Sequence, residues 1–244
     1  MRVYGLLGKT LKHSFSKAYF TQKFEAEGIP GCRYENFELA SMDELPELIR
    51  SVPGLQGLNV TIPYKEAVLP FLHGQNDIVQ EVKACNCIKI TDGKLHGYNT
   101  DVIGFRQSLE KSLEPQHTSA LVLGTGGAAK AVQYALKSLG IRYRMVSRSK
   151  GENTITYSEL TPELIGEHLL VVNTSPLGMY PNVNEAPPLP YEALTSRHLL
   201  YDLIYNPEKT LFLQKGEAQG ARIANGAEML LLQAEESWKI WNSY

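Results

Sequence analysis

The sequence predicts a two-domain α/β protein. With about 150 residues for an average domain, a chain of 244 residues is long enough for one large domain or two modest ones. Strand-like apolar runs alternate with helix-like stretches along the chain, which is typical of a mainly parallel sheet covered by helices. After a polar break at residues 114–117, a glycine-rich turn between a strand-like and a helix-like stretch opens a second pattern of this kind.

The first hundred residues predict a mainly parallel α/β domain. Gly28 ends the first expected helix, and Pro63 suits the first turn of the third. Asp92-Gly93 is a dipeptide preferred in two-residue turns, so we expect a hairpin at one edge of the sheet. The expected helices are residues 16–27, 43–51 and 63–72, and the expected strands are residues 3–7, 32–39, 55–61, 87–90 and 94–97.

The second half predicts another α/β domain, joined to the first by a helix at residues 101–113. A further helix runs from the glycine-rich turn to Gly140. The pattern alone leaves open on which half the last apolar helix, residues 227–241, packs. The expected strands are residues 120–123, 142–147, 169–173 and 199–203.

The composition excludes several functional classes. Hydrophobic residues make up 43% of the chain and charged residues 20%, as in proteins with an ordinary buried core. The 24 Lys and Arg residues nearly balance the 26 Asp and Glu residues, which disfavours a nucleic-acid partner. No apolar run approaches the roughly 20 residues of a membrane helix, and the N-terminus lacks a signal-peptide core. We therefore expect a cytoplasmic protein that binds no membrane.

Gly124, Gly126 and Ala129 fit the pattern G-x-G-x-x-G/A at the point where a strand turns into a helix. The first glycine makes the tight turn, the second lets the backbone approach a pyrophosphate, and the small third residue lets the helix pack on the strand. The free N–H groups and the positive dipole end of the helix then face the phosphates. This context predicts a Rossmann-like, dinucleotide-binding domain rather than a glycine-rich turn without a ligand.

The next strand ends in Ser147-Arg148-Ser149-Lys150, where an NAD enzyme usually offers a carboxylate to the adenosine ribose. A carboxylate would repel a 2′-phosphate, whereas Arg148 and Lys150 attract one. The sequence therefore favours NADP; two exposed basic residues without a ligand are the alternative. Only residues 151–154 separate this strand from residues 155–157, so we expect a short loop in place of the usual crossover helix.

Polar residues of the first half are candidates for the chemistry. The run Asn59-Val60-Thr61-Ile62-Pro63-Tyr64-Lys65 places three polar side chains at the carboxyl end of a strand, where open α/β sheets bind ligands. Lys65 lies near the start of a helix, where the dipole disfavours a cation. Asp101 lies at the junction of the two halves. A Lys beside an Asp can exchange a proton with an alcohol or a carbonyl, as hydride transfer requires; capping and surface roles are the alternative.

The remaining polar candidates point to no metal. Ser14 and Ser16 are first interpreted as helix N-caps, although their hydroxyls could also hold a carboxylate. The six histidines show no metal-ligand spacing. The three cysteines, Cys32, Cys85 and Cys87, provide neither a disulfide framework nor a zinc site.

With these residues in view, the chain resembles the shikimate dehydrogenase family from end to end. Seven motifs of that family occur in the family's order, which makes the resemblance specific. The matching stretches are residues 8–16 (GKTLKHSFS), 59–65 (NVTIPYK), 99–101 (NTD), 124–128 (GTGGA), 173–179 (NTSPLGM), 201–207 (YDLIYNP) and 225–233 (NGAEMLLLQ).

The resemblance implies an NADP-linked, reversible interconversion of 3-dehydroshikimate and shikimate in aromatic amino-acid and chorismate biosynthesis. It implies Lys65 as the acid/base with Asp101 orienting it, and leaves Asp101 as an alternative proton carrier. The implied substrate-binding residues are Ser14, Ser16, Asn59, Thr61, Asn86, Asp101, Tyr205 and Gln233. The implied NADP-binding residues are Gly124, Gly126, Gly127, Ala128, Ser147, Arg148, Ser149, Lys150, Thr174, Gly226 and Met229.

The resemblance also implies a division of the chain. Residues 1–100 form a substrate-binding domain that a C-terminal segment, residues 225–244, completes, and residues 101–224 form the Rossmann-like NADP-binding domain. The chain departs from the family at three places. Cys87 replaces a threonine after Asn86, Ser147 replaces an asparagine before Arg148, and the helix after Lys150 is missing.

Two other functions fit the same motifs. One is a quinate/shikimate dehydrogenase that uses NAD, although such enzymes often carry an acidic residue at the adenosine end, which this chain lacks. The other is a non-catalytic NADP(H)-sensing protein of the same fold, which would have no need of Lys65 and Asp101 together. Either a monomer or a homodimer is compatible with the sequence.

Overall fold

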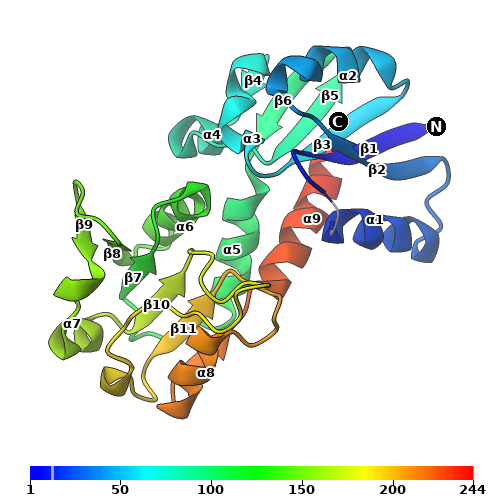
Figure 1. The fold of residues 1–244 in the computed structure, drawn as a ribbon. Helices are drawn as coiled ribbons and strands as arrows, with labels where there is room; N and C mark the ends of the chain where they lie inside the picture. Colours follow the sequence, from blue (N-terminus) through cyan, green and yellow to red (C-terminus); the bar gives the residue numbers. More distant parts are fainter. Residues whose placement is uncertain (12–13, 244) are drawn as a thin grey trace. The chain divides into compact units, whose positions relative to one another are not determined.

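The computed structural model describes residues 1–11 and 14–243, so His13 of the first motif lies outside the described residues, as does Tyr244. The chain divides into two compact units. The first comprises residues 1–100 and 234–244, and the second comprises residues 101–233. Each unit is an α/β layer structure in which helices cover a central sheet (Figure 1).

The first unit contains a six-stranded mixed sheet of order β2-β1-β3-β5-β6-β4. Strand β1 is parallel to β2 and β3, and β4 is parallel to β6, while β5 is antiparallel to β3 and β6. The strands are β1 (Arg2–Gly8), β2 (Cys32–Glu38), β3 (Leu55–Val60), β4 (Gly74–Gln75), β5 (Cys87–Thr91) and β6 (Lys94–Tyr98). The helices are α1 (Phe15–Ala26), α2 (Leu45–Ser51), α3 (Tyr64–Ala67) and α4 (Asp77–Val82), with 3-10 turns at Met42–Glu44 and Leu69–Phe71.

Two apolar cores lie on opposite faces of this sheet, because successive side chains of a strand point to opposite sides. Val3 of β1 packs in one core with Leu45 of α2. Its neighbour Tyr4 packs in the other core with Phe20 of α1 and Trp241 of α9 (Ala227–Asn242). Figure 1 shows α2 on one side of the sheet, and α1 and the C-terminal part of α9 on the other.

Trp241 attaches the end of α9 to the sheet. Its side chain is 5% exposed, its ring stacks on Tyr4 at a centroid distance of 4.9 Å, and its Nε1 donates to the carbonyl oxygen of Ile88 at 3.0 Å. A Cβ atom at Gly57 would lie 2.3 Å from this Nε1, so the indole requires a glycine on the strand below it. The C-terminal segment is therefore part of the first unit's core.

We expect Trp241→Ala to lower the free energy of unfolding of the first unit by about 3–5 kcal/mol, because it removes a large buried ring and leaves a cavity. Urea unfolding followed by circular dichroism measures the change. Leu231→Ala, at an apolar residue that is 43% exposed in the part of α9 that belongs to the second unit, is the control and should have a much smaller effect. Equal losses in the two variants would show that Trp241 is not a core residue.

The second unit contains a six-stranded sheet of order β12-β11-β10-β7-β8-β9, in which all neighbouring strands are parallel. Its first strand lies in the middle and the order reverses there, which is the doubly wound arrangement of the Rossmann fold. The predicted Rossmann-like fold is confirmed. The strands are β7 (Ser119–Leu123), β8 (Arg142–Ser147), β9 (Thr154–Thr156), β10 (Leu170–Asn173), β11 (Leu199–Asp202) and β12 (Arg222–Ala224). The helices are α5 (Thr100–Glu110), α6 (Gly127–Ser138), α7 (Pro162–Glu167) and α8 (Leu211–Ala218), with 3-10 turns at Tyr157–Glu159 and Tyr191–Ala193.

The connection from β8 to β9 is unusually short. The two strands are parallel, with Ser147 paired to Thr156, and only residues 148–153 join them. Parallel neighbours ordinarily need a crossover of a dozen or more residues, usually a helix. Residues 148–153 form no helix, which confirms the expected short loop.

Three expectations from the sequence are wrong in detail. The helix expected at residues 63–72 ends at Ala67 and continues as a 3-10 turn, because Pro70 has no N–H to donate to a helix. The hairpin of β5 and β6 does not lie at the sheet edge, because the two-residue strand β4, too short to give a pattern, pairs outside β6. Residues 225–233 belong to the second unit, because the first turns of α9 pack tightly on Gly104 of α5.

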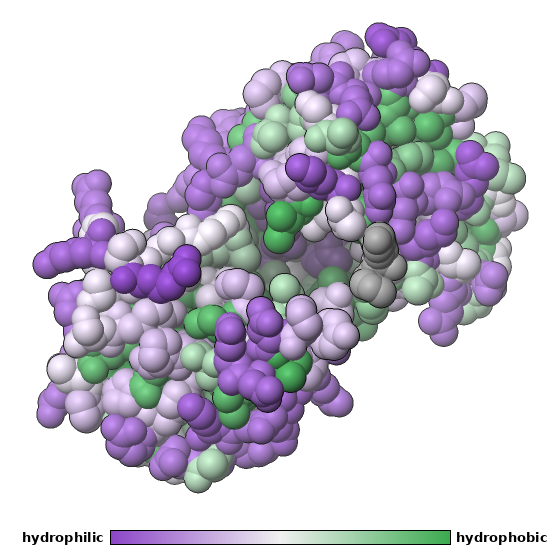
Figure 2. All heavy atoms as spheres, in the orientation of Figure 1, coloured by the Kyte–Doolittle hydropathy of each residue, from purple (hydrophilic) through white to green (hydrophobic). Residues whose placement is uncertain are grey.

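The remaining predicted elements form at their predicted positions, with ends within about one helical turn. Among the described residues, no helix combines the length and apolarity that crossing a membrane requires. On the face drawn in Figure 2, hydrophilic and pale residues predominate on both units, and hydrophobic residues lie in small groups.

Candidate functional site

The predicted residues of the first unit gather at one edge of its sheet. The pairs Leu7–Val60, Asn59–Cys87 and Cys87–Tyr98 place the carboxyl ends of β1, β3 and β6 and the amino end of β5 at that edge. The carboxyl ends of parallel strands are where α/β sheets bind ligands. Ser14 and Ser16 follow β1, and Thr100 follows β6. Asn59 lies on β3, and Thr61 and Lys65 follow it. Asn86 directly precedes β5.

Lys65 lies in the short helix α3 and is half-buried. Its carbonyl oxygen accepts from the Cys85 N–H at 2.8 Å, which ties this helix to the segment before β5. The Thr61 N–H donates to the Leu7 carbonyl oxygen at 2.9 Å, so the loop that leads to Lys65 is fixed at both ends. The backbone around Lys65 is therefore well defined.

Asp101 is the second residue of α5 and belongs to the second unit. Residues 99 and 100 before it are almost fully buried in the first unit. The Asn99 Nδ2 donates to the Ala84 carbonyl oxygen at 2.9 Å, and the Thr100 N–H donates to the Asn86 Oδ1 at 2.6 Å. The N-T-D stretch is therefore attached to the first unit up to the residue before Asp101.

Ser14 is the N-cap of α1, since its Oγ accepts from the Lys17 N–H at 3.4 Å. The interpretation as an N-cap is thus confirmed for this serine, which is half-buried. Ser16 is 9% exposed and lies in the first turn of α1.

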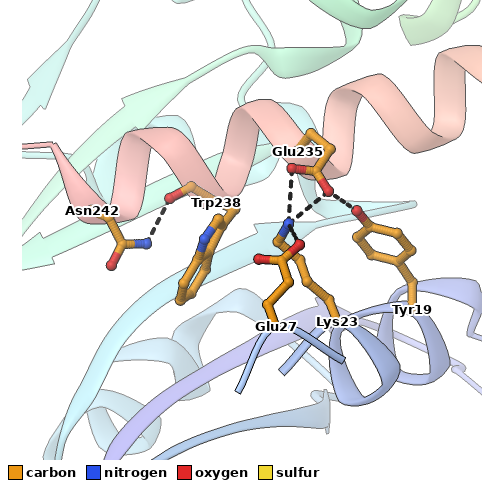
Figure 3. A network of polar contacts seen from close by, with 6 residues as sticks. All are labelled: Tyr19, Lys23, Glu27, Glu235, Trp238 and Asn242. Carbon is orange, nitrogen blue, oxygen red and sulfur yellow. Dashed lines mark hydrogen bonds and ion pairs between the residues drawn. The ribbon is translucent and has the colours of Figure 1, made fainter. Parts of the chain in front are cut away.

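A charged network joins α1 to α9 within the first unit (Figure 3). The Lys23 Nζ contacts Glu27 at 2.6 Å and Glu235 at 2.9 Å, and the Tyr19 hydroxyl donates to Glu235. Burial acts to lower the pKa of Lys23, but the two carboxylates outweigh it and raise that pKa. This network holds the helix that carries Ser14 and Ser16 against α9.

The glycine-rich turn of the second unit depends on one unusual backbone conformation. Gly124 follows β7 with φ +114°, a region that side chains rarely allow. A Cβ atom there would lie 2.8 Å from the Thr174 Oγ1, and this hydroxyl donates to the Leu123 carbonyl oxygen at 2.8 Å. Thr174 therefore lies against the turn, on the loop that follows β10.

The next two glycines leave room for a ligand. A Cβ atom at Gly126 or Gly127 would meet no heavy atom within 4 Å, so packing of the protein itself does not require glycine at either position. Gly126 is the N-cap of α6 and provides no side-chain hydrogen bond to the helix. Ala129 is fully buried, as close packing of helix on strand requires, and Ala128 beside it is half-buried. The residues thus fit the pyrophosphate of a dinucleotide.

The basic residues at the end of β8 are open to solvent. Ser147 is half-buried at the last position of the strand, and Arg148, Ser149 and Lys150 are exposed in the short connection that follows. All of them lie at the carboxyl edge of the second sheet, as do Thr174 and the glycine-rich turn, because its strands are parallel. The positive charge therefore lies at the edge at which a dinucleotide would bind.

Gly226, Met229 and Tyr205 also lie beyond the carboxyl ends of their strands. A Cβ atom at Gly226 would lie 2.0 Å from the Leu203 carbonyl oxygen, so the chain requires glycine at this close approach. Met229 is half-buried in the first turns of α9, and Tyr205 is 42% exposed in the loop after β11. Gln233, in α9, is 8% exposed, and its Nε2 donates to the Leu230 carbonyl oxygen at 2.9 Å.

Asp202, which was not predicted from the sequence, links the loops after β10 and β11. Its carboxylate is fully buried and accepts from the Asn173 Nδ2 at 3.1 Å, the Ile204 N–H at 3.0 Å and the Thr210 Oγ1 at 2.6 Å. Burial raises the pKa of Asp202 to about 6. The signal in the sequence was a carboxylate directly after a buried apolar strand, within the YDLIYNP motif.

We expect the free energy of unfolding of the wild type, measured relative to that of the Asp202→Asn variant, to be higher at about pH 4.5 than at about pH 7. The folded pKa of about 6 lies above the ordinary value of 3.8, so the folded chain retains a proton that the unfolded chain releases. The contribution of Asp202 to the free energy of unfolding therefore falls between about pH 4 and pH 6. Urea unfolding at the two pH values measures it. Asp92→Asn, at an exposed turn, is the control, and an equal difference at both pH values for Asp202→Asn would contradict the expectation.

The described residues contain no group of three or more His, Cys, Asp and Glu side chains that could hold a metal ion. The candidate site residues offer hydroxyls, amides, a carboxylate and the amino group of Lys65. These are groups that bind polyhydroxylated acids and exchange protons with them.

Comparison with known proteins identifies the family. A family model described as the shikimate dehydrogenase substrate binding domain matches residues 6–88. A shikimate dehydrogenase (NADP(+)) of Caldicellulosiruptor bescii is 36% identical over 97% of this chain and 88% of its own length. The chain belongs to the shikimate dehydrogenase family.

Two solved structures extend the comparison to the fold of this shikimate dehydrogenase family member. A shikimate 5-dehydrogenase of Thermus thermophilus, in complex with NADP(H) and shikimate, is 30% identical with a TM-score of 0.87, covering 99% of this chain and 94% of that one. A quinate dehydrogenase of Corynebacterium glutamicum, in complex with NAD, is 26% identical with a TM-score of 0.89, covering 99% of this chain and 93% of that one. The predicted family and fold class are confirmed.

One departure from the shikimate dehydrogenase pattern is structural. Cys87, which replaces a threonine of the family, is fully buried, and burial raises the pKa of its thiol. Cys85, two residues earlier, is also fully buried and donates its thiol to the Cys87 carbonyl oxygen at 3.3 Å. The Cys87 thiol therefore stays protonated, and both cysteines act as small core residues.

Proposed function

We propose that the protein is an NADP-dependent shikimate dehydrogenase, which catalyses the reversible reduction of 3-dehydroshikimate to shikimate. The observation that carries this proposal is the similarity over 97% of the chain to a relative of that name. All seven motifs lie in the order of the family, and the gathered residues of the two sheet edges have the chemistry that the reaction needs. This step belongs to chorismate and aromatic amino-acid biosynthesis.

The two parts of the chain have separate tasks in this proposal. Residues 1–100 and 234–244 provide most of the substrate-binding residues, and residues 101–233 bind NADP. When bound, NADP supplies or accepts the hydride at its nicotinamide ring. The enzyme works in the cytoplasm as a monomer or homodimer, with no nucleic-acid or membrane partner.

The substrate is a carboxylic acid with a ring of hydroxyl groups. The Ser14 and Ser16 hydroxyls donate to its carboxylate without a full positive charge, and Tyr205 covers that side. The residues that bind the ring hydroxyls are Asn59, Thr61, Asn86, Asp101 and Gln233. Amide and carboxylate groups both suit this task, because a hydroxyl donates one hydrogen bond and accepts others.

Lys65 moves the proton of the reaction. In reduction, the carbonyl oxygen of the substrate gains a proton from the Lys65 ammonium as the carbonyl carbon gains the hydride. In oxidation, the hydroxyl proton returns to the Lys65 amine. Asp101 orients Lys65, and Asp101 as the proton carrier is the alternative.

The cofactor is held by the carboxyl edge of the second sheet. Gly124, Gly126, Gly127 and Ala128 allow the close approach of the pyrophosphate to the N-terminus of α6. Ser147, Arg148, Ser149 and Lys150 bind the 2′-phosphate, which only NADP carries. Gly226 and Met229 lie beside the nicotinamide, and Thr174 also binds the cofactor. The open space at Gly126 and Gly127 supports this arrangement.

A second candidate is a dehydrogenase that also oxidises quinate and uses NAD. The similarity to the quinate dehydrogenase of Corynebacterium glutamicum favours it, whereas the basic residues after β8 favour NADP. Initial rates with shikimate and with quinate, each with NADP and with NAD, separate the two. We expect efficient turnover only with the combination of shikimate and NADP. Comparable rates with NAD or quinate would establish the second candidate.

A further inference from the structure

We infer that Ser237 of α9 is a positioning residue that fixes the end of β3 at Asn59, which leads to Lys65, and fixes Thr100, which directly precedes Asp101. This inference rests on the proposed function. Ser237 is fully buried in the first unit, and no motif of the sequence contains it. It belongs to a chain of hydrogen bonds among five buried polar side chains from separate segments, which are Tyr34, Asn59, Asn86, Thr100 and Ser237.

One arm of this hydrogen-bonded chain leads from Ser237 to β3. The Asn59 Nδ2 donates to the Ser237 Oγ at 2.8 Å and to the Asn86 carbonyl oxygen at 3.4 Å. The Asn59 Oδ1 accepts from the Tyr34 hydroxyl at 2.8 Å, and burial raises the pKa of that hydroxyl well above its usual value. Both amide hydrogens of Asn59 are thus engaged within the protein. The strand end that leads to Thr61 and Lys65 is fixed by side chains as well as by the sheet.

The other arm leads from Ser237 to the start of α5. The oxygens of Ser237 and Thr100 lie 3.3 Å apart, and the Asn86 Nδ2 donates to the Thr100 Oγ1 at 3.0 Å. The Thr100 N–H donates to the Asn86 Oδ1 at 2.6 Å. Because Thr100 directly precedes Asp101, the hydrogen bonds of Thr100 also fix the backbone position at which Asp101 begins.

The Ser237 Oγ lies within hydrogen-bond distance of both the Asn59 amide and the Thr100 hydroxyl. Deleting its hydroxyl leaves the Asn59 amide and the Thr100 hydroxyl each without one buried partner, and both shift to recover it. A misplacement of about 1 Å in a catalytic constellation can cost on the order of a hundredfold in rate. The predicted defect is therefore in kcat and not in the binding of NADP.

The test compares Ser237→Ala with Tyr4→Phe. Tyr4 is a fully buried residue of the same unit, packs on α9 through Trp241, and its hydroxyl donates to Gln56 at 3.2 Å, outside the chain of hydrogen bonds. We expect Ser237→Ala to lower kcat about tenfold or more, with KM for NADP unchanged and a shifted pH profile of kcat. Amide hydrogen exchange at Thr100 should also become faster. Tyr4→Phe should change stability alone.

Two variants of Thr100 guard against a folding defect. Thr100→Val removes the hydroxyl at constant shape and should reproduce the kcat loss of Ser237→Ala, whereas Thr100→Ser keeps the hydroxyl and should retain most of the activity. Active wild type together with a Ser237→Ala variant that behaves like Tyr4→Phe would overturn the inference alone. A wild type without turnover would overturn the proposed function, and the inference with it.

Discussion

Lys65→Ala should lower kcat for shikimate oxidation by about a thousandfold, because a positioned general acid or base contributes about 10²–10⁴ to the rate. Binding of NADP should be unchanged, since the residues proposed for the cofactor lie in the other unit. Initial rates give kcat, and quenching of intrinsic fluorescence on NADPH addition gives the cofactor affinity. A non-catalytic sensor would bind NADPH and respond to its partner without Lys65.

Lys94→Ala is the matched control, because Lys94 is an exposed lysine of the same unit, at the hairpin of β5 and β6. It should leave all kinetic constants unchanged. A Lys65→Ala variant with more than about a tenth of the wild-type kcat would contradict the role of Lys65. Asp101 would then be the better assignment for the proton carrier.

The double variant Arg148→Ala/Lys150→Ala should raise KM for NADP by about a hundredfold and leave KM for NAD nearly unchanged. Each hydrogen bond to a charged group contributes about 1.5–3 kcal/mol, which corresponds to roughly 10–100-fold in affinity. The effect should weaken at high salt, because both side chains are exposed and screened. Kinetics with the two cofactors at low and high salt measure it.

Arg142→Ala controls for a general loss of positive charge, because Arg142 is exposed at the opposite, amino end of β8. It should not change the preference between the cofactors. Equal losses for NADP and NAD in the double variant would show that the two residues do not read the 2′-phosphate. The missing helix after Lys150 would then have to be examined as the cause of an altered cofactor site.

Most of the fold follows from local patterns in the sequence. The alternation along β1 reflects the burial of alternate side chains on opposite faces of a strand. The glycine-rich turn before α6 reflects the close packing of a helix on a strand. The two-residue strand β4 carries no such pattern, since its pairing depends on the neighbouring hairpin. The division of α9 between two units depends on tertiary packing at Gly104 and Trp241, which a single helical period cannot reveal.

Some residues of the candidate site were predictable from the sequence, because their residue type is unusual for the place that they occupy in a helix or strand. Lys65 is unfavourable near the start of a helix, and Arg148 is unnecessary for stability at the end of a strand, so their positions in the sequence indicate a functional role. Ser237 and Asp202 were not predictable as site residues, because a serine in a helix and an aspartate after a strand have many ordinary roles. Their importance depends on partners that are distant in the sequence, such as Asn59 for Ser237.

The most direct test of the proposed function is product formation in the direction of reduction, in which a hydride passes from NADPH to 3-dehydroshikimate. The purified protein is mixed with 3-dehydroshikimate and NADPH, NADPH consumption is followed by absorbance, and the product is identified by NMR. We expect one shikimate to form for each NADPH consumed, and no NADPH consumption without 3-dehydroshikimate. An absence of NADPH consumption, or consumption without shikimate, would contradict it.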